Sequence, residues 1–121
     1  MANGILIVDD SAQFCALAAE LLAEQGFEVL GVAADGAQAL AAVARACPLG
    51  ILLDVNLPGP DGFAVAASLA VACPQTTIVL TSAGVAHVSA GVLNDCAAAA
   101  FVPKQELVAT DLRTLFRPAG T

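Results

Sequence analysis

Short, continuous apolar segments recur along the chain at intervals that leave room for a helix between them. The segments are Ile5–Val8, Val29–Leu30 with Val32, Ile51–Leu53, Ile78–Leu80 and Phe101–Val102. Runs of this length, without polar alternation, are typical of strands that are buried on both faces, as in a parallel sheet. The pattern therefore predicts five strands.

The segment from Ser11 to Gln25 is the clearest of the predicted helices. Ser11 is a favourable N-cap residue, and Gly26 is suited to end the helix. The apolar stripe of this helix consists of Phe14, Leu17, Leu21 and Leu22. Four further helices are predicted from Asp35, as N-cap, to Pro48, from near Gly62 to before Pro74, from about Val85 to Ala97, and from Glu106 to Phe116.

Strands that alternate with helices in a chain of this length indicate right-handed βαβ units and a parallel sheet with helices on both faces. The expected fold is a doubly wound, flavodoxin-like (βα)5 sandwich with strand order 2-1-3-4-5. In that order, a ligand crevice opens outside the carboxyl ends of the first and third strands. We expect one domain over residues 1–121, with its core at about 4–117 and a flexible tail at 118–121.

Composition narrows the functional classes. Of the 121 residues, 59% are hydrophobic and 12% are charged, which excludes intrinsic disorder. Four Lys and Arg residues against 11 Asp and Glu give a net charge of −7. Four cationic side chains are too few to neutralise several phosphates. We therefore expect neither direct nucleic-acid binding nor attachment to an anionic membrane surface.

The stretch from Gly62 to Asn94 contains no charged residue. Pro74 to Thr77 and then Thr81-Ser82 interrupt it, so no apolar run is long enough to span a membrane. The first residues also lack the pattern of a signal peptide, and we expect a cytoplasmic protein. The low charge of this stretch predicts a surface used for partner binding or for a homodimer.

The four cysteines are widely and unevenly spaced and form no C-x-x-C motif. They are Cys15, Cys47, Cys73 and Cys96. This spacing argues against a zinc site and against a disulfide framework. We expect these residues to be small buried hydrophobic side chains.

Polar residues follow the predicted strands at the edge where a doubly wound fold binds ligands. Asp9 and Asp10 follow the first strand, Asp54 ends the third, Thr81-Ser82 end the fourth, and Lys104 follows the fifth. Carboxylates at the switch point suit Mg²⁺, and a hydroxyl with an ammonium could hold phosphoryl oxygens. One Lys and one Mg²⁺ would balance the three carboxylate charges.

At these residues the chain resembles the receiver domain of two-component response regulators, in particular the single-domain chemotaxis regulators, from about Ile5 to Phe116. The matching motifs are Ile5-Leu6-Ile7-Val8-Asp9-Asp10-Ser11, Leu53-Asp54-Val55-Asn56-Leu57-Pro58 with Asp61-Gly62, Leu80-Thr81-Ser82-Ala83, and Phe101-Val102-Pro103-Lys104. One departure is Ala97-Ala98, where the family commonly has Gly-Ala, so the residue best suited to a left-handed helix stop is absent.

The resemblance implies a role for each matching residue. Asp54 would accept a phosphoryl group from a sensor histidine kinase or phosphotransfer protein. Asp10, Asp54 and the backbone carbonyl of Asn56 would bind Mg²⁺ directly, and Asp9 would bind it through water. Ser82 lies 22 positions before Lys104, as in the family pattern, so we expect Ser82 and Lys104 to bind the phosphoryl oxygens. Thr81 would then point to the opposite face of its strand.

The resemblance also implies an output. Phe101 occupies the position of the family's aromatic switch residue and would respond together with Ser82. The signal would leave through the fourth helix, fifth strand and fifth helix, toward a downstream protein or effector domain. The protein would be a regulatory phosphoacceptor that catalyses only its own phosphorylation and dephosphorylation.

Two other functions compete with this reading. A phosphatase of the haloacid dehalogenase type also combines an Asp nucleophile, a Lys and Mg²⁺, but it needs Asp-x-Asp on its first strand, and this chain has adjacent Asp9 and Asp10. A receiver-fold binding module that takes no phosphate would not need the complete set of site residues.

Overall fold

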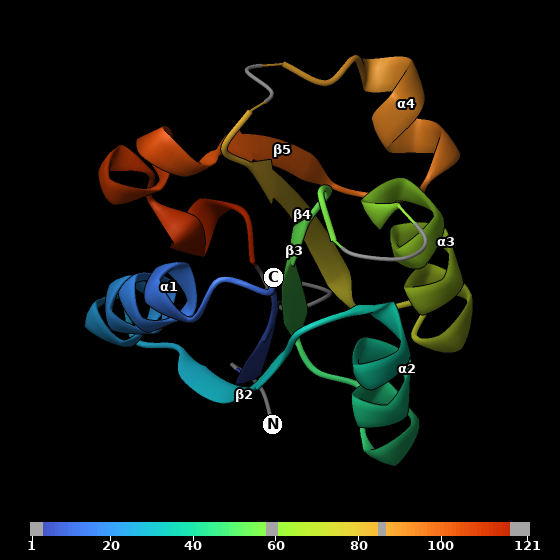
Figure 1. The fold of residues 1–121 in the computed structure, drawn as a ribbon, viewed down its shortest axis with the longest axis horizontal. Coiled ribbons are helices and arrows are strands. Elements are labelled where there is room, and N and C mark those ends of the chain that lie inside the picture. The colour runs from blue at the N-terminus through green and yellow to red at the C-terminus, as the bar shows by residue number, and fades with distance from the viewer. Residues whose placement is uncertain (1–3, 58–60, 85–86, 117–121) are drawn as a thin grey trace.

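The computed structural model describes residues 4–57, 61–84 and 87–116, which form one five-stranded parallel sheet (Figure 1). The strands are β1 (Gly4–Val8), β2 (Glu28–Ala33), β3 (Gly50–Asp54), β4 (Thr77–Ser82) and β5 (Ala100–Pro103). Their order is β2-β1-β3-β4-β5, and each neighbouring pair is parallel. The predicted doubly wound, flavodoxin-like fold class is confirmed.

Helices cover both faces of the sheet. The α-helices are α1 (Ala12–Glu24), α2 (Gly36–Arg45), α3 (Gly62–Ala72) and α4 (Ala90–Asp95), and two 3₁₀ helices follow, η1 (Lys104–Ala109) and η2 (Leu112–Thr114). Figure 1 shows α1 and the 3₁₀ turns on one side of the sheet and α2, α3 and α4 on the other. Among the described residues, no helix combines the length and apolar character needed to cross a membrane.

The core consists of two layers, one on each side of the sheet. Because side chains alternate along a strand, Ile5 and Ile7 of β1 pack with α1 and the 3₁₀ turns, whereas Leu6 and Val8 pack with α2 and α3. The central strands β1 and β3 are buried along their full length. This burial on both faces explains their continuous apolar sequences.

The predicted starts of the first two helices and the predicted stop of the first helix are confirmed. Ser11 and Asp35 cap α1 and α2, and their side chains accept hydrogen bonds from the backbone N–H groups of Phe14 and Gln38. Gly26 follows α1 with φ of 92°, a conformation that L-residues rarely adopt. The predicted stripe of α1 is only partly right, because the buried side chains are Cys15, Ala18 and Leu22, and Leu17 is exposed.

The prediction of a regular fifth helix over Glu106 to Phe116 is wrong, because η1 and η2 occupy this segment. Thr110 has extended backbone, and the Asp111 side chain accepts a hydrogen bond from Arg113 N to start η2. The side chain of Gln25, which directly follows α1, donates to Thr110 O at 3.2 Å and accepts from Leu112 N at 2.7 Å. Backbone groups that a continuous helix would pair internally are thus satisfied by a distant residue.

The fourth helix is shorter than predicted. Residues 87–89 are not helical, α4 spans Ala90–Asp95, and the predicted start at Val85 lies outside the described residues. At its end, Ala97 N donates to Asn94 O and Ala98 N donates to Leu93 O, as in a Schellman motif. Ala97 has φ of 62°, so an alanine occupies the left-handed position that usually carries glycine.

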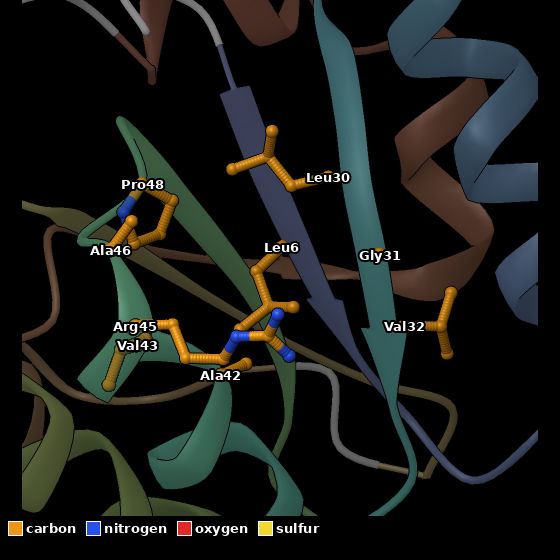
Figure 2. Close-up of a pocket in the computed structure, with 9 residues that line it drawn as sticks. All are labelled: Leu6, Leu30, Gly31, Val32, Ala42, Val43, Arg45, Ala46 and Pro48. Atoms are coloured by element: carbon orange, nitrogen blue, oxygen red, sulfur yellow. The ribbon is translucent and has the colours of Figure 1, made fainter.

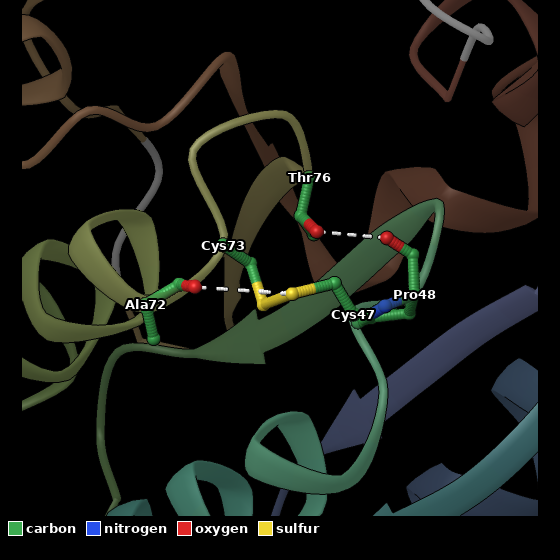
Figure 3. Close-up of a disulfide and its surroundings, with 5 residues drawn as sticks. All are labelled: Cys47, Pro48, Ala72, Cys73 and Thr76. Carbon is green, nitrogen blue, oxygen red and sulfur yellow. Dashed lines mark hydrogen bonds between the residues drawn. A yellow bond between two sulfur atoms is a disulfide. The ribbon is translucent and has the colours of Figure 1, made fainter.

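The expectation that all four cysteines are unpaired is wrong. Cys47 and Cys73 form a disulfide with Cα atoms 5.7 Å apart, which joins the segment after α2 to the end of α3 (Figure 3). Thr76 Oγ1 donates to Pro48 O at 2.7 Å beside it. Spacing along the chain could not show that these two helix ends meet. Cys15 and Cys96 are free and buried, as expected.

The second strand is less buried than its apolar sequence predicts. β2 is an edge strand, and Leu30 and Val32 are 44% and 53% exposed. An edge strand has a neighbouring strand on one side only, and these two side chains are not covered. The prediction that the second strand is buried on both faces is therefore wrong.

The expected tail at 118–121 lies outside the described residues.

Reduction of the Cys47–Cys73 disulfide is expected to lower the free energy of unfolding by roughly 3 kcal/mol, because the bridge closes a loop with a sequence separation of 26 residues. Denaturant unfolding with and without a thiol reductant measures this change. In the Cys47→Ser variant the reductant should have no such effect. Four titratable thiols in the unreduced, denatured protein would contradict the bridge.

Ala97→Gly is expected to raise the free energy of unfolding by about 1 kcal/mol, because glycine adopts the left-handed conformation without the steric cost that alanine has. Thermal and denaturant unfolding measure this gain. Ala99→Gly is the matched control, since Ala99 has no positive φ, and it should give no gain. Equal effects of the two substitutions would show that the backbone conformation of Ala97 is not the cause.

Candidate functional site

The carboxyl end of β1 places two acidic side chains in different environments. Asp9 is 2% exposed, and its Oδ1 accepts a hydrogen bond from Ser11 N at 2.8 Å. Asp10 is exposed. The Cys15 thiol of α1 donates to the Asp9 carbonyl oxygen at 3.4 Å, so the first turn of the helix helps to hold this strand end in place.

Asp54, at the end of β3, lies beside Asp9 because β3 pairs directly with β1. It is 5% exposed, and its Oδ1 accepts a hydrogen bond from Asn56 N at 3.0 Å. Gly62, at the start of α3, donates its N–H to Val55 O. A Cβ at Gly62 would lie 2.3 Å from Val55 Cα and 2.8 Å from Asp54 O, so only glycine lets α3 begin this close to the Asp54 backbone.

The hydroxyl residues at the end of β4 point in different directions, as predicted. Thr81 Oγ1 donates to Val102 O of β5 at 2.7 Å. Ser82 Oγ accepts from Asn56 Nδ2 at 2.7 Å and from Gly84 N at 3.2 Å. Ser82 is therefore linked to the loop that carries Asp54, whereas Thr81 bonds to the neighbouring strand.

Lys104 reaches the carboxylates from the start of η1. Its Nζ lies 2.8 Å from Asp9 Oδ2 and 3.7 Å from Asp54 Oδ2. The ammonium also lies over the Phe14 ring of α1, 4.2 Å from the ring centroid. Asp9, Asp54, Ser82 and Lys104 thus meet at the carboxyl edge of the sheet, with the exposed Asp10 next to them.

Phe101 lies on β5, and its half-buried side chain packs against the core layer formed with α2, α3 and α4. Nothing in this placement distinguishes a switch residue from an ordinary core aromatic. Its role as a switch stays a prediction.

Two site contacts were missed at the sequence level. One is the Asn56 side chain on Ser82, because only the Asn56 backbone carbonyl was assigned a role. The other is Phe14 against Lys104. The sequence contained a partial signal for Phe14, which stands three residues after the N-cap Ser11 and thus near the strand ends.

The cluster carries more negative than positive charge. One carboxylate oxygen from each of Asp9, Asp10 and Asp54 lies within 4.8 Å of the others, and among the described residues Lys104 is the cation that contacts two of them, Asp9 and Asp54. Burial, followed by repulsion from Asp9, raises the pKa of Asp54 above its ordinary value, although the Asn56 N–H and Lys104 act in the opposite direction.

The donor set fits a divalent cation. The site offers oxygen donors, which Mg²⁺ prefers, and an excess of negative charge. Asp9 Oδ2 is buried and accepts no hydrogen bond of good geometry, although it forms the ion pair with Lys104. In the part of the chain that the structure describes, the Lys104 ammonium is its one polar contact, so a further lone pair of this oxygen could accept a hydrogen bond from a metal-bound water.

The sequence model for the response regulator receiver domain matches residues 5–116. This chain belongs to that family. Receivers of two-component systems typically bind Mg²⁺ at an acidic cluster and are phosphorylated. Among its relatives, the receiver is 34% identical over 83 residues to the chemotaxis protein CheY of Bacillus subtilis, a match that covers 69% of each chain.

A second relative is much longer than this receiver. The chain is 42% identical over 80 residues to protein-glutamate methylesterase/protein-glutamine glutaminase 2 of Anaeromyxobacter dehalogenans, which covers 64% of this chain and 23% of the relative. The receiver therefore spans about a quarter of that enzyme. A putative response regulator from Chloroflexus aurantiacus matches the structure with a TM-score of 0.79 at 25% identity, over 96% of this chain and 98% of that chain.

Asp54→Asn is expected to stabilise the metal-free receiver at neutral pH. The raised pKa of Asp54 means that the folded protein disfavours the ionised carboxylate relative to the unfolded chain. The asparagine removes this cost, and Asn Oδ1 can still accept from Asn56 N. As the pH falls through the raised pKa, the wild-type carboxyl becomes protonated, so the advantage of the variant should shrink.

Urea unfolding of both proteins with a chelator present, at neutral and at acidic pH, measures this difference. Asp61→Asn is the control, because Asp61 caps α3 and asparagine is an equally good cap. A variant less stable than wild type at neutral pH would contradict the expected cost of the Asp54 charge.

Proposed function

We propose that this receiver accepts a phosphoryl group on Asp54 from the phosphohistidine of a sensor histidine kinase or phosphotransfer protein. The reaction depends on Mg²⁺, and the phosphoryl group is later lost by self-catalysed hydrolysis. The observation that carries the proposal is the arrangement of the Asp54 carboxylate: Oδ1 accepts from Asn56 N at 3.0 Å, and Oδ2 faces Lys104 Nζ at 3.7 Å.

In the proposed transfer, a carboxylate oxygen of Asp54 attacks phosphorus and forms the new O–P bond. The P–N bond to the donor imidazole breaks, and its electron pair returns to the ring nitrogen. The Asn56 N–H fixes the orientation of the Asp54 carboxylate, and the Lys104 ammonium stabilises the negative charge on the phosphoryl oxygens. Positioning and charge neutralisation are the protein's main contributions to such a step.

Asp10, Asp54 and the Asn56 carbonyl are the residues we assign to hold Mg²⁺ directly, with Asp9 acting through water. When bound, the cation supplies positive charge that offsets the carboxylates and the incoming phosphoryl group. Lys104 pairs with Asp9 at 2.8 Å, and that contact keeps the ammonium near Asp54. The Phe14 ring covers the ammonium and favours this position through a cation–π contact.

The signal would begin at Ser82. Its hydroxyl oxygen accepts a hydrogen bond from Asn56 Nδ2, which leaves the Ser82 O–H to donate to a phosphoryl oxygen. Phe101 lies on the adjoining strand and packs toward α4, which is short and has no buried residue. We propose that the output face combines α4, β5 and η1, and that a downstream protein or effector domain binds it.

Incubation with acetyl phosphate and Mg²⁺ tests the phosphoacceptor function. Intact-mass analysis should show the gain of one phosphoryl group in wild type and none in Asp54→Asn. Asp35→Asn is the matched control: it retains the α2 cap and should be phosphorylated normally. Omission of Mg²⁺ should greatly slow the reaction.

Each contrary result favours a different function. No mass gain in the wild type would favour a receiver-fold module that binds a partner without phosphate. Turnover of an external phosphomonoester would favour a phosphatase. A gain that persists in Asp54→Asn would place the phosphoryl group on another residue.

A further inference from the structure

A groove lies between the edge strand β2 and the end of α2, away from the acidic cluster. Its volume is about 380 Å³, and its walls are mostly apolar. Figure 2 shows Leu6 on β1 at its base, Gly31 on β2, and Ala46 and Pro48 on the segment that leads to β3. Pro48 precedes β3, so the groove lies toward the amino ends of the strands, whereas Asp54 lies at a carboxyl end.

Gly31 is the reason that the groove is open. The sheet register pairs Gly31 with Leu6, and a Cβ at Gly31 would meet no atom within 4 Å. The register also shifts between Ile5 and Leu6, which leaves Leu30 as an extra residue in β2. The missing side chain thus leaves an uncovered space above Leu6, and the backbone there can accept a larger residue.

The outer edge of β2 is unpaired in the described part of the chain. The strand has one charged residue, the exposed Glu28 at its first position, and residues 29–33 carry no charge. Exposed edge strands are normally guarded by charged residues, proline or a covering segment, because their free N–H and C=O groups can pair with another chain. Leu30 and Val32 are largely exposed, and Figure 2 shows Val32 pointing away from the groove. A strand added at this edge would cover both side chains.

Arg45 adds a charge to this surface. Figure 2 shows its side chain extending from the end of α2 toward Leu6, across the groove. Among the described residues, Lys104 pairs with Asp9 and Asp54, and Arg113 pairs with Asp111, but Arg45 forms no ion pair. In a chain of net charge −7, an unpaired cation beside an apolar groove complements a ligand with one carboxylate.

We propose that an extended segment of a partner protein adds as a strand to β2, places an apolar side chain in the groove above Gly31, and pairs a carboxylate with Arg45. Backbone pairing would supply affinity, and the groove and Arg45 would supply specificity. A second copy of this chain is disfavoured as the occupant, because two chains of net charge −7 repel each other. This surface is separate from the proposed phosphoryl site and does not depend on it.

The test uses a pool of acetylated hexapeptide amides of the form Thr-Φ-Φ-Asp-Φ-Thr, in which Φ is Val, Ile, Leu or Phe. Titration into ¹⁵N-labelled receiver at physiological ionic strength should shift the amide signals of Glu28–Ala33 and the Arg45 side chain. Hydrogen exchange of the β2 amides should slow, because strand addition gives them backbone partners. Replacing Asp by Asn in the pool should weaken binding by up to about fivefold, the scale of an exposed ion pair.

Two variants locate the effect without harming the fold. Gly31→Val fills the groove at a position where a Cβ meets nothing, and valine favours strands, so this variant should fold but lose binding. Arg45→Gln should bind the Asp and Asn pools equally. Val71→Thr, which changes an apolar residue that is 83% exposed on α3, should bind like wild type.

The proposal is overturned by any of four results. The β2 signals do not move at millimolar peptide, or Gly31→Val binds as well as wild type. Alternatively, the β2 signals move with receiver concentration alone, which would assign the edge to self-association. Decanoate serves as a comparison: equal shifts with decanoate, without slowed exchange at β2, would assign the groove to small apolar carboxylates instead of a strand.

Discussion

The contact of one ammonium with two buried carboxylates is the interaction on which the site depends. Asp9 and Asp54 come from adjacent strands, and Lys104 reaches both from the segment after β5. Buried carboxylates this close together repel each other, and a nearby cation reduces that cost. The order β1-β3-β4-β5 within the sheet brings the site residues to one edge, so the site requires these four strands together.

Close packing around two glycines supports this arrangement. Gly62 allows α3 to begin against the backbone of Asp54 and Val55, and this contact shapes the loop that orients the acidic side chain. Gly50, at the other end of β3, leaves space for the Phe116 ring, which a Cβ would meet at 2.2 Å. Phe116 in turn packs edge-on against Phe27 and helps to hold the 3₁₀ segment against the sheet. At each end of β3, therefore, a glycine permits a close contact that any larger residue would prevent.

Much of the fold and most of the site could be predicted from local patterns. Ser11 and Asp35 cap helices because their side chains bond to backbone only three residues away. The site residues follow strands, and parallel strands bring their carboxyl ends to one edge. The prediction of a fifth helix was wrong because the contact that interrupts this helix is not local. Its break at Thr110 and Asp111 is stabilised by Gln25, a residue 85 positions away, and no local pattern contains that contact.

The sequence alone determined the strands and the first helix caps, because these follow from short-range periodicity. It also determined the strand order and the residues that gather at the carboxyl edge, because these follow from the general geometry of βαβ units. Only the tertiary structure decided which surfaces are covered. It paired Cys47 with Cys73, joined Asn56 to Ser82 and exposed Leu30 and Val32 on the edge strand. Each of these outcomes depends on which distant segments pack together, and the spacing of residues along a chain does not specify the distances between them in space.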